Sequence, residues 1–255
     1  MRKRLTIFLL FTISLLLVVA VGRSVVAQDW RTASREPVGL APMAAAMPGA
    51  VVQVYAARTV GARGAFGVHT WVATKAAGEA GYTVYEVMGW RLRWGSSVVV
   101  IHQRAPDGRW FGAEPELLAD VRGPEAERLI PRIDAAARAY PWASEYQAWP
   151  GPNSNTFTAW IARAVPELGV DFPATAIGKD YSESLFGAAP SGSGGQFSLG
   201  GLFALTASGV EGLEVNLLGL SFGLGPSGLK LPIVGRIGPR VEAAGAPTPK
   251  APLSN

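Results

Sequence analysis

Apolar and polar residues alternate along much of the first half of the chain, at the period of two that is typical of β-strands. Glycine-containing stretches such as "GARGAFG" and "AAGEAG" interrupt the alternation and predict turns. Because short turns join strands that run side by side in opposite directions, the pattern predicts an antiparallel meander. The four predicted strands are Ala50–Arg58, Val68–Lys75, Tyr82–Trp94 and Ser96–Arg104.

In the middle of the chain the apolar residues change to helical spacing. The stretch "EPELLADVRG" predicts a short helix that ends at Gly123. Pro124 is well placed to begin a second helix, in which Pro131 is expected to cause a kink. An aromatic connector precedes a third helix, predicted from about Ser154 to Pro166. These elements predict an α+β fold, an antiparallel meander packed with about three helices.

The segment 187–240 is apolar and interrupted by many glycines. We expect it to form one or two strands as a glycine-rich β extension of a domain that spans 51–186. Its apolar surface has two alternative locations, against the meander or on a membrane, because large exposed apolar patches mark partner or lipid contacts. The remaining residues, 241–255, are rich in Ala and Pro and predict a disordered tail.

An uncharged apolar run of 18 residues, Leu5–Gly22, follows three basic residues near the N-terminus. A positive flank before such a run is typical of a signal sequence, and the run is long enough to span a bilayer. We therefore expect residues 1–27 to be a signal peptide or a signal anchor (a transmembrane helix), and the length favours the anchor. Residues 28–50 then form a linker, and both alternatives place the following domain outside the cytoplasm.

The net charge of +4 comes from the N-terminus. Four basic residues and no acidic residue precede Gln28, so the 19 basic residues that remain (23 minus 4) balance the 19 acidic ones. A domain without excess positive charge gives no indication of nucleic-acid binding. The chain has no cysteine and only two histidines, His69 and His102, so we expect no disulfide, no cofactor and no metal site.

One set of residues is suited to nucleophilic catalysis. Ser154 stands at the predicted start of the third helix, where unpaired backbone N–H groups favour negative charge and can hold an oxyanion. His69, in a predicted strand, is the candidate base, and Glu86, on the next strand, is the candidate residue to orient it. A hairpin around "AAGEAG" brings the two strands together, and the register decides which faces they present.

Each of these residues also has an ordinary structural explanation. Ser and Asn are preferred at helix N-caps, so "NSNT" can simply cap the third helix. A lone histidine on a strand is more often a core or surface residue than a base. A glutamate on a strand usually faces water. Catalytic and purely structural roles are therefore both open at this point.

Four long motifs stand out between Asp29 and Tyr181. They are "VVQVYAARTVGARGAFGVHTWVATK", "YTVYEVMGWRLR", "YPWASEYQAWPGPNSNTFTAWIARAVPEL" and "TAIGKDY". With these motifs the chain resembles a family of bacterial, usually membrane-anchored proteins known only as a domain of unknown function. The resemblance implies membrane anchoring and implies no activity.

A remoter resemblance concerns "NSNTF" (Asn153–Phe157). This stretch is similar to the nucleophile motif of circularly permuted papain-like hydrolases of the NlpC-like and desumoylating-isopeptidase-like types. In those enzymes a strand histidine comes first and a cysteine at a helix N-terminus follows. The resemblance implies a permuted papain-like fold in which Ser154 replaces the cysteine, His69 is the base and Glu86 orients it. Serine is a weaker nucleophile than cysteine and depends more on its base.

The sequence therefore predicts a membrane-associated protein of the cell envelope. We expect it in the bacterial inner membrane with its domain facing the periplasm, or secreted to the periplasm after signal cleavage. Three functions are open: a hydrolase or acyltransferase that uses Ser154, His69 and Glu86, a non-catalytic envelope binding module, and a lipid-contacting structural protein. The expected partners are the membrane, through the N-terminal helix, and an envelope peptide or lipid ligand.

Overall fold

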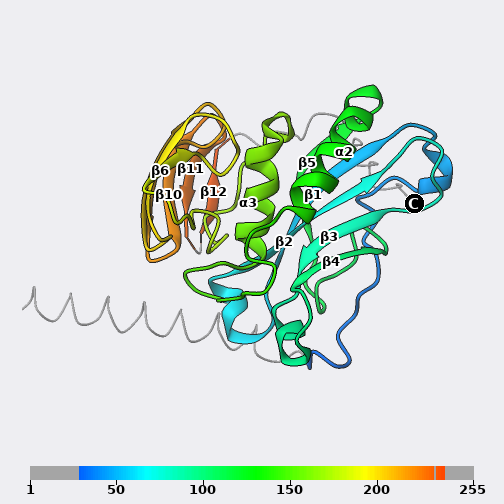
Figure 1. Ribbon diagram of the computed structural model, residues 1–255, viewed down its shortest axis with the longest axis horizontal. Helices are drawn as coiled ribbons and strands as arrows, with labels where there is room; N and C mark the ends of the chain where they lie inside the picture. Colours follow the sequence, from blue (N-terminus) through cyan, green and yellow to red (C-terminus); the bar gives the residue numbers. More distant parts are fainter. Residues whose placement is uncertain (1–28, 233, 239–255) are drawn as a thin grey trace, which may run out of the picture.

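The computed structural model describes residues 29–232 and 234–238 and contains two antiparallel sheets, of five and seven strands (Figure 1). The predicted signal segment 1–27 and the predicted tail 241–255 lie outside the described residues. Among the residues that are described, no helix is both long and apolar enough to cross a membrane.

Strands dominate the fold, so the predicted α+β class, with a permuted papain-like packing of about three helices, is wrong. The described residues form two α-helices, α2 (Pro124–Arg138) and α3 (Ser154–Ala164). These confirm the second and third predicted helices, and Pro131 lies inside α2. Four short 3-10 helices accompany them: Ala44–Ala46, Gly61–Ala65, Gly89–Trp94 and Pro166–Leu168.

The five-stranded sheet has the order β4-β3-β2-β1-β5. Its strands are β1 (Val51–Arg58), β2 (Val68–Lys75), β3 (Thr83–Val87), β4 (Val99–Gln103) and β5 (Glu116–Arg122). The predicted meander is confirmed for β1 to β4, which pair in chain order. β5 pairs with β1, where the sequence predicted a short helix. The two consecutive leucines resemble a helical pattern, but Leu117 packs on one face of the sheet and Leu118 on the other.

β3 is shorter than its predicted strand. It ends at Val87, and Gly89–Trp94 forms a 3-10 helix instead of continuing the strand. Gly89 lies against the ring of Tyr146, so closely that a Cβ atom there would stand 2.4 Å from Tyr146 Cδ1. Glycine at position 89 therefore lets the Tyr146 ring pack against the backbone where the 3-10 helix begins.

The two faces of the five-stranded sheet have different partners. α2 and α3 cover one face, where a core forms with the sheet residues Val52, Val54, Val72, Tyr85 and Val87. On the opposite face a second cluster is formed by Val51, Tyr55, Trp71, Ala73 and Val84, with Trp110 packed against it. Part of the predicted linker 28–50 also packs on this second cluster, through Leu40, Ala41, Ala44 and Met47.

The segment predicted to contain one or two strands, together with Phe186 just before it, forms a seven-stranded sheet in which every strand pairs with its neighbours in the chain. Its strands are β6 (Phe186–Ala188), β7 (Gly195–Leu199), β8 (Phe203–Ser208), β9 (Gly212–Leu217), β10 (Leu220–Gly225), β11 (Gly228–Leu231) and β12 (Gly235–Ile237). Tight turns rich in glycine separate these short strands, which is why the sequence shows only a glycine-interrupted apolar run. The sheet lies beside α3, where Arg163 Nε donates to the carbonyl of Ala188 (Figure 1).

Candidate functional site

A buried carboxylate joins three strands at the face opposite the helices. Glu86 Oε1 accepts hydrogen bonds from His102 Nε2 (2.7 Å) and Arg104 Nε (3.1 Å), and Glu86 Oε2 accepts one from His69 Nε2 (3.0 Å). The strand register explains why His102 and Glu86 are in contact. His102 on β4 is paired with Val84 on β3, and Val84 stands two residues before Glu86 on the same strand. Residues two apart on a strand share a face, so His102 and Glu86 point to the same side of the sheet.

The charge state of this cluster follows from its environment. Burial alone would raise the pKa of Glu86, but hydrogen bonds from His102 and His69 and the charge of Arg104 hold it well below its usual range. Burial lowers the pKa of His69, against the opposing effect of Glu86. Glu86 is therefore ionised. Because an ionised carboxylate only accepts hydrogen bonds, the histidine nitrogens that face it carry the protons.

The two histidines differ in what else they contact. His69 is 4% exposed and its ring stacks on Trp110, with 3.6 Å between the ring centroids and 12° between the planes. The side chain of His102 is 35% exposed and lines a cavity of about 250 Å³. With its Nε2 directed at Glu86, His102 has Nδ1 left to accept a proton. Its arrangement is that of a base oriented by a carboxylate.

The cavity combines positive charge with aromatic walls. Its lining residues are Arg35, Glu86, Met88, Trp90, His102, Arg104, Ala105, Arg109, Trp110 and Phe111. Arg104 pairs with Glu86, and Arg109 makes two hydrogen bonds to Glu114 Oε1. Arg35 has no carboxylate within ion-pair distance among the described residues, and its guanidinium lies 4.3 Å from the ring centroid of Phe111. The cavity therefore carries one guanidinium more than its neighbouring carboxylates neutralise.

A tight turn positions the aromatic wall. Trp110 and Ala113 exchange two backbone hydrogen bonds, of 2.9 Å and 3.1 Å, across Phe111 and Gly112. Both turn residues have positive φ, 48° for Phe111 and 89° for Gly112. Bulky residues rarely occupy this left-handed region, where glycine and asparagine are favoured. Phe111 packs edge-on against both Trp90 and Trp110, so the strained backbone holds an aromatic ring at the cavity.

Ser154 occupies the other face of the sheet. Thr70 Oγ1 donates to the Ser154 carbonyl (3.3 Å) and to Asn155 Oδ1 (3.0 Å), so Thr70 points toward α3. His69 precedes Thr70 on β2 and therefore points to the opposite side. No hydrogen bond joins Ser154 to His69 in the described part of the chain. The structure brings His69 and Glu86 together without Ser154, and the catalytic role of the three residues stays a prediction.

The helix cap belongs to the residue before Ser154. Asn153 Oδ1 accepts hydrogen bonds from the backbone N–H groups of Asn155 (2.9 Å) and Thr156 (3.2 Å). Thr156 Oγ1 accepts one in return from the Asn153 backbone N–H (3.0 Å), which completes a capping box. Asn153 Nδ2 also donates to the carbonyls of Ala148 and Ile177. The "NSNT" stretch thus caps α3 through Asn153.

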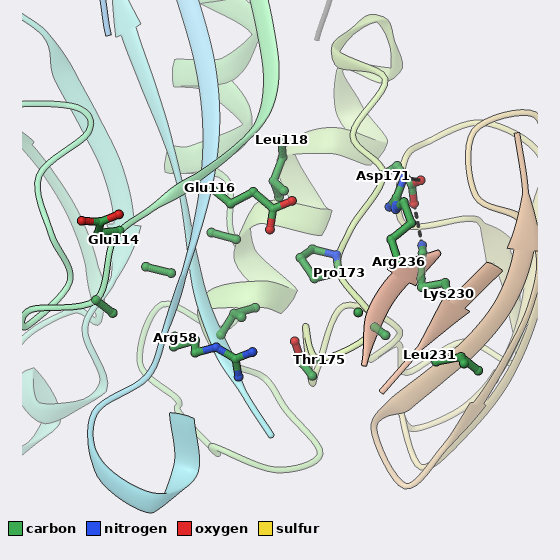
Figure 2. Close-up of a pocket in the computed structure, with 16 residues that line it drawn as sticks. Arg58, Glu114, Glu116, Leu118, Asp171, Pro173, Thr175, Lys230, Leu231 and Arg236 are labelled. Atoms are coloured by element: carbon green, nitrogen blue, oxygen red, sulfur yellow. Dashed lines mark hydrogen bonds and ion pairs between the residues drawn. The ribbon is translucent and has the colours of Figure 1, made fainter. Parts of the chain in front are cut away.

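A second cavity, of about 420 Å³, lies between the two sheets (Figure 2). Arg58 and Glu116 reach it from the five-stranded sheet, and Asp171, Lys230 and Arg236 line the other side. Asp171 pairs with Lys230 at 2.5 Å and with Arg236 at 2.6 Å, so these charges satisfy one another. Their contacts fix the C-terminal sheet to the segment before it and leave no unpaired charge on that side among the described residues that line the cavity.

Several residues of the first cavity were not predicted as site residues: His102, Arg104, Arg35 and Trp110. His102 and Arg104 carry a usable signal, because they stand two apart on a predicted strand and thus share a face. Arg35 carries none, because it belongs to a segment without periodicity. No group of three or more His, Cys, Asp or Glu side chains within the described ranges is arranged to hold a metal ion.

Comparison with known protein families shows to which family the chain belongs. Residues 49–181, more than half of the 255 residues, match the family described as Protein of unknown function (DUF3750), and the chain belongs to this family. No curated protein and no solved structure matches the chain. The matched region contains Glu86, His69, His102, Arg104 and Ser154 and ends before β6. The family therefore indicates a domain of unknown function and leaves its activity to be argued from the site.

Proposed function

We propose that this domain binds a small anionic ligand with an apolar part in the cavity between β3, β4 and the turn at Phe111. The observation that carries the proposal is the charge balance. Three guanidiniums, of Arg35, Arg104 and Arg109, face two neighbouring carboxylates, of Glu86 and Glu114. An anion at Arg35 completes the pairing, and arginine binds carboxylates and phosphates through two parallel hydrogen bonds.

Two further features support an anion at this place. Arg104 Nη2 is buried and has no hydrogen-bond partner among the described residues, so a donor remains for an oxygen. Such buried unpaired donors are uncommon in folded proteins. The volume of about 250 Å³ is below the ~300–1,000 Å³ of sites for drug-sized ligands, which favours a small molecule.

The apolar part of the ligand is inferred from the aromatic walls. Trp90 and Trp110 stack with 6.0 Å between their ring centroids, and Phe111 closes the cavity at an edge. Aromatic side chains bind flat apolar groups and acyl chains through dispersion and burial. A carboxylate or phosphate attached to a ring or short acyl chain fits both features.

Attachment to the envelope remains part of the proposal. With the segment Leu5–Gly22 as an anchor, the domain faces the periplasm, and the ligand is a carboxylate- or phosphate-bearing component of the envelope. The site then acts as a binding module that samples such components near the membrane.

Acid–base catalysis is the second candidate function, and the His102–Glu86 pair favours it. The cavity lining contains no serine, threonine or cysteine, so the nucleophile would be water. His102 Nδ1 would take a proton from water as its oxygen attacks a bound ester or amide carbonyl, and would return the proton to the leaving group. Release of nitrophenolate from 4-nitrophenyl hemisuccinate tests this. A wild-type rate that His102→Gln leaves unchanged excludes His102 as the base.

The binding proposal is tested by thermal unfolding with matched pairs of probes. Benzoate and phenyl phosphate should raise the unfolding temperature of the full chain, whereas their neutral counterparts benzamide and phenol should not. Acetate and inorganic phosphate, which lack the apolar part, should act more weakly. Equal effects of charged and neutral probes, or no effect from any of the four anions, would contradict the proposal.

A further inference from the structure

The C-terminal sheet presents its apolar face outward. In β8 and β9 the outward positions hold Leu205, Leu213, Val215 and Leu217. The alternate positions hold buried residues, which are Ala204 and the polar Thr206, Glu214 and Asn216. Leu213 and Leu224, paired across β9 and β10, are 68% and 65% exposed. The outward pairing continues through further apolar residues: Phe186, Phe197, Phe222, Leu229 and Ile237.

The polar face of the same sheet points inward, where its charged side chains are paired and only the Ser221 hydroxyl, among the described residues of this face, has no hydrogen-bond partner. Glu214 pairs with both Lys179 and Lys230, and Asp180 accepts hydrogen bonds from Gln196 (2.6 Å) and Asn216. Gly223 stands opposite Glu214, where a Cβ atom would lie 2.7 Å from Glu214 Cγ, so the glycine makes room for this carboxylate. Because every buried charge has a partner, the register is fixed and the apolar side is held outward.

The outward face has no charge to balance its apolar side chains. Between Phe186 and Ile237 the sequence contains only four charged residues, and each of them contacts an inward partner. They are Glu211, Glu214, Lys230 and Arg236. Water-facing sheets carry polar side chains outward and bury their apolar face, so this sheet has the pattern suited to an apolar surrounding.

We infer that this face rests on the acyl chains of a lipid bilayer. Protein interfaces are enriched in aromatic residues and Arg and carry hydrogen bonds across them, with Trp, Tyr and Arg as their usual hot spots. The outward face is mainly Leu, with Phe, Val and Ile and none of those hot-spot residues, and lipid chains need no other match. The edge strands β6 and β12 leave backbone groups without a strand partner among the described residues, so the sheet lies on the bilayer with its face and does not cross it.

The turn between β9 and β10 is consistent with this orientation. Its tip is Leu218, which is 65% exposed and has a φ of 54°, a conformation that water-facing hairpin turns give to asparagine or glycine. Trp149, 51% exposed, donates its indole N–H to the Leu218 carbonyl (2.8 Å). A half-exposed tryptophan beside an apolar surface is typical of the membrane–water interface.

The absence of cysteine allows a direct test on the full chain. Single variants Leu213→Cys and Leu224→Cys carry an environment-sensitive NBD label, and Met43→Cys, 76% exposed on the other part of the molecule, is the matched control. The proteins are reconstituted in phosphatidylcholine vesicles, and quenching is measured with doxyl-labelled lipid and with iodide. We expect doxyl lipid, and not iodide, to quench the labels at 213 and 224, and the reverse at 43.

Three outcomes overturn the inference. Quenching by iodide at 213 and 224 shows that the face is in water. Protection from both quenchers shows that a protein, such as a second copy of this chain, covers it. Failure of the full chain to float with the vesicles excludes bilayer contact. A second check needs no label on the protein. Trp149→Phe should reduce the quenching of tryptophan fluorescence by doxyl lipid, and an unchanged value counts against the inference.

Discussion

Glu86 and His102 meet across neighbouring strands, with His102 Nε2 2.7 Å from Glu86 Oε1, at the wall of a cavity that also holds Arg35, which has no carboxylate partner among the described residues. The carboxylate is fully buried and binds three donors at once. This contact links the stability of the domain to its proposed function, because the same carboxylate holds β2, β3 and β4 together and orients the histidine.

Replacement of Glu86 by glutamine should destabilise the domain strongly. The amide has one acceptor oxygen and turns an N–H toward a group of donors, which leaves buried partners unpaired. Breaking a buried ion pair in this way costs about 3–5 kcal/mol. Urea unfolding measures the change, and Glu167→Gln, which removes a surface pair with Arg132, is the control that should change little. A Glu86→Gln protein as stable as wild type would contradict the buried cluster.

Acid should destabilise the domain in two steps. The folded-state pKa of His69 lies below its ordinary value of 6.5, so below pH 6.5 the unfolded chain binds a proton that the folded chain does not. The pKa of Glu86 is also lowered in the folded state, so below its ordinary value of 4.5 the unfolded chain again binds a proton that the folded chain does not, and stability falls further. The stability that these two groups contribute is therefore fully present above about pH 6.5. As the pH falls below that value, the unfolding free energy decreases by up to about 1.4 kcal/mol per pH unit for each proton taken up on unfolding.

The variant His69→Gln tests whether His69 causes the first of these two losses of stability. His69→Gln keeps a donor for Glu86 and removes the titrating ring, so the loss of unfolding free energy between pH 6.5 and 5.5 should disappear. Urea unfolding at these pH values is the measurement. An equal loss in the variant and in wild type would show that His69 is not the responsible group.

Part of this site was predictable from the sequence, and the rest depended on register. The turn "AAGEAG" predicts that the strands of His69 and Glu86 are neighbours, and they are. Which face each residue takes is decided by a single step along the strand: His69 points to Glu86, and Thr70, one residue later, points to Ser154. A motif such as "NSNTF" carries no information on that step.

The errors in fold prediction have a similar physical origin. In the C-terminal sheet the polar residues Glu214 and Lys230 point inward, against the usual rule, so an apolar, glycine-interrupted segment did not resemble seven strands. In β5 two consecutive leucines serve opposite faces of the sheet and imitate helical spacing. By contrast, the helices α2 and α3 begin at local signals, Pro124 and the Asn153 cap, which the sequence contains in full.

Phe111 should be more important for binding than for folding. Its left-handed backbone costs of order 1–3 kcal/mol, which asparagine tolerates better, and this gain offsets part of the lost aromatic packing. We expect Phe111→Asn to change the unfolding free energy by no more than about 1 kcal/mol and to weaken benzoate binding at least fivefold. Fluorescence of the cavity tryptophans follows the binding. Unchanged affinity would remove Phe111 from the site.

The cap and the predicted nucleophile can be separated by two alanine variants. Asn153→Ala loses the capping box and the donors to the Ala148 and Ile177 carbonyls, for an expected cost of about 2–3 kcal/mol. Ser154→Ala should cost below about 0.5 kcal/mol, since the Ser154 hydroxyl makes no hydrogen bond to a described residue. Thermal and urea unfolding compare them. Labelling of wild type but not Ser154→Ala by a fluorophosphonate would instead support the predicted serine nucleophile.

Calorimetric titration with benzoate tests the central claim most directly, through Arg35, which has no carboxylate partner among the residues that the structure describes. The account predicts that wild type and the surface control Arg138→Gln bind benzoate equally, that Arg35→Gln binds it at least tenfold more weakly, and that none of them binds benzamide comparably. Equal benzoate affinity in Arg35→Gln and wild type, or benzamide affinity equal to that of benzoate, would contradict an anion-binding cavity.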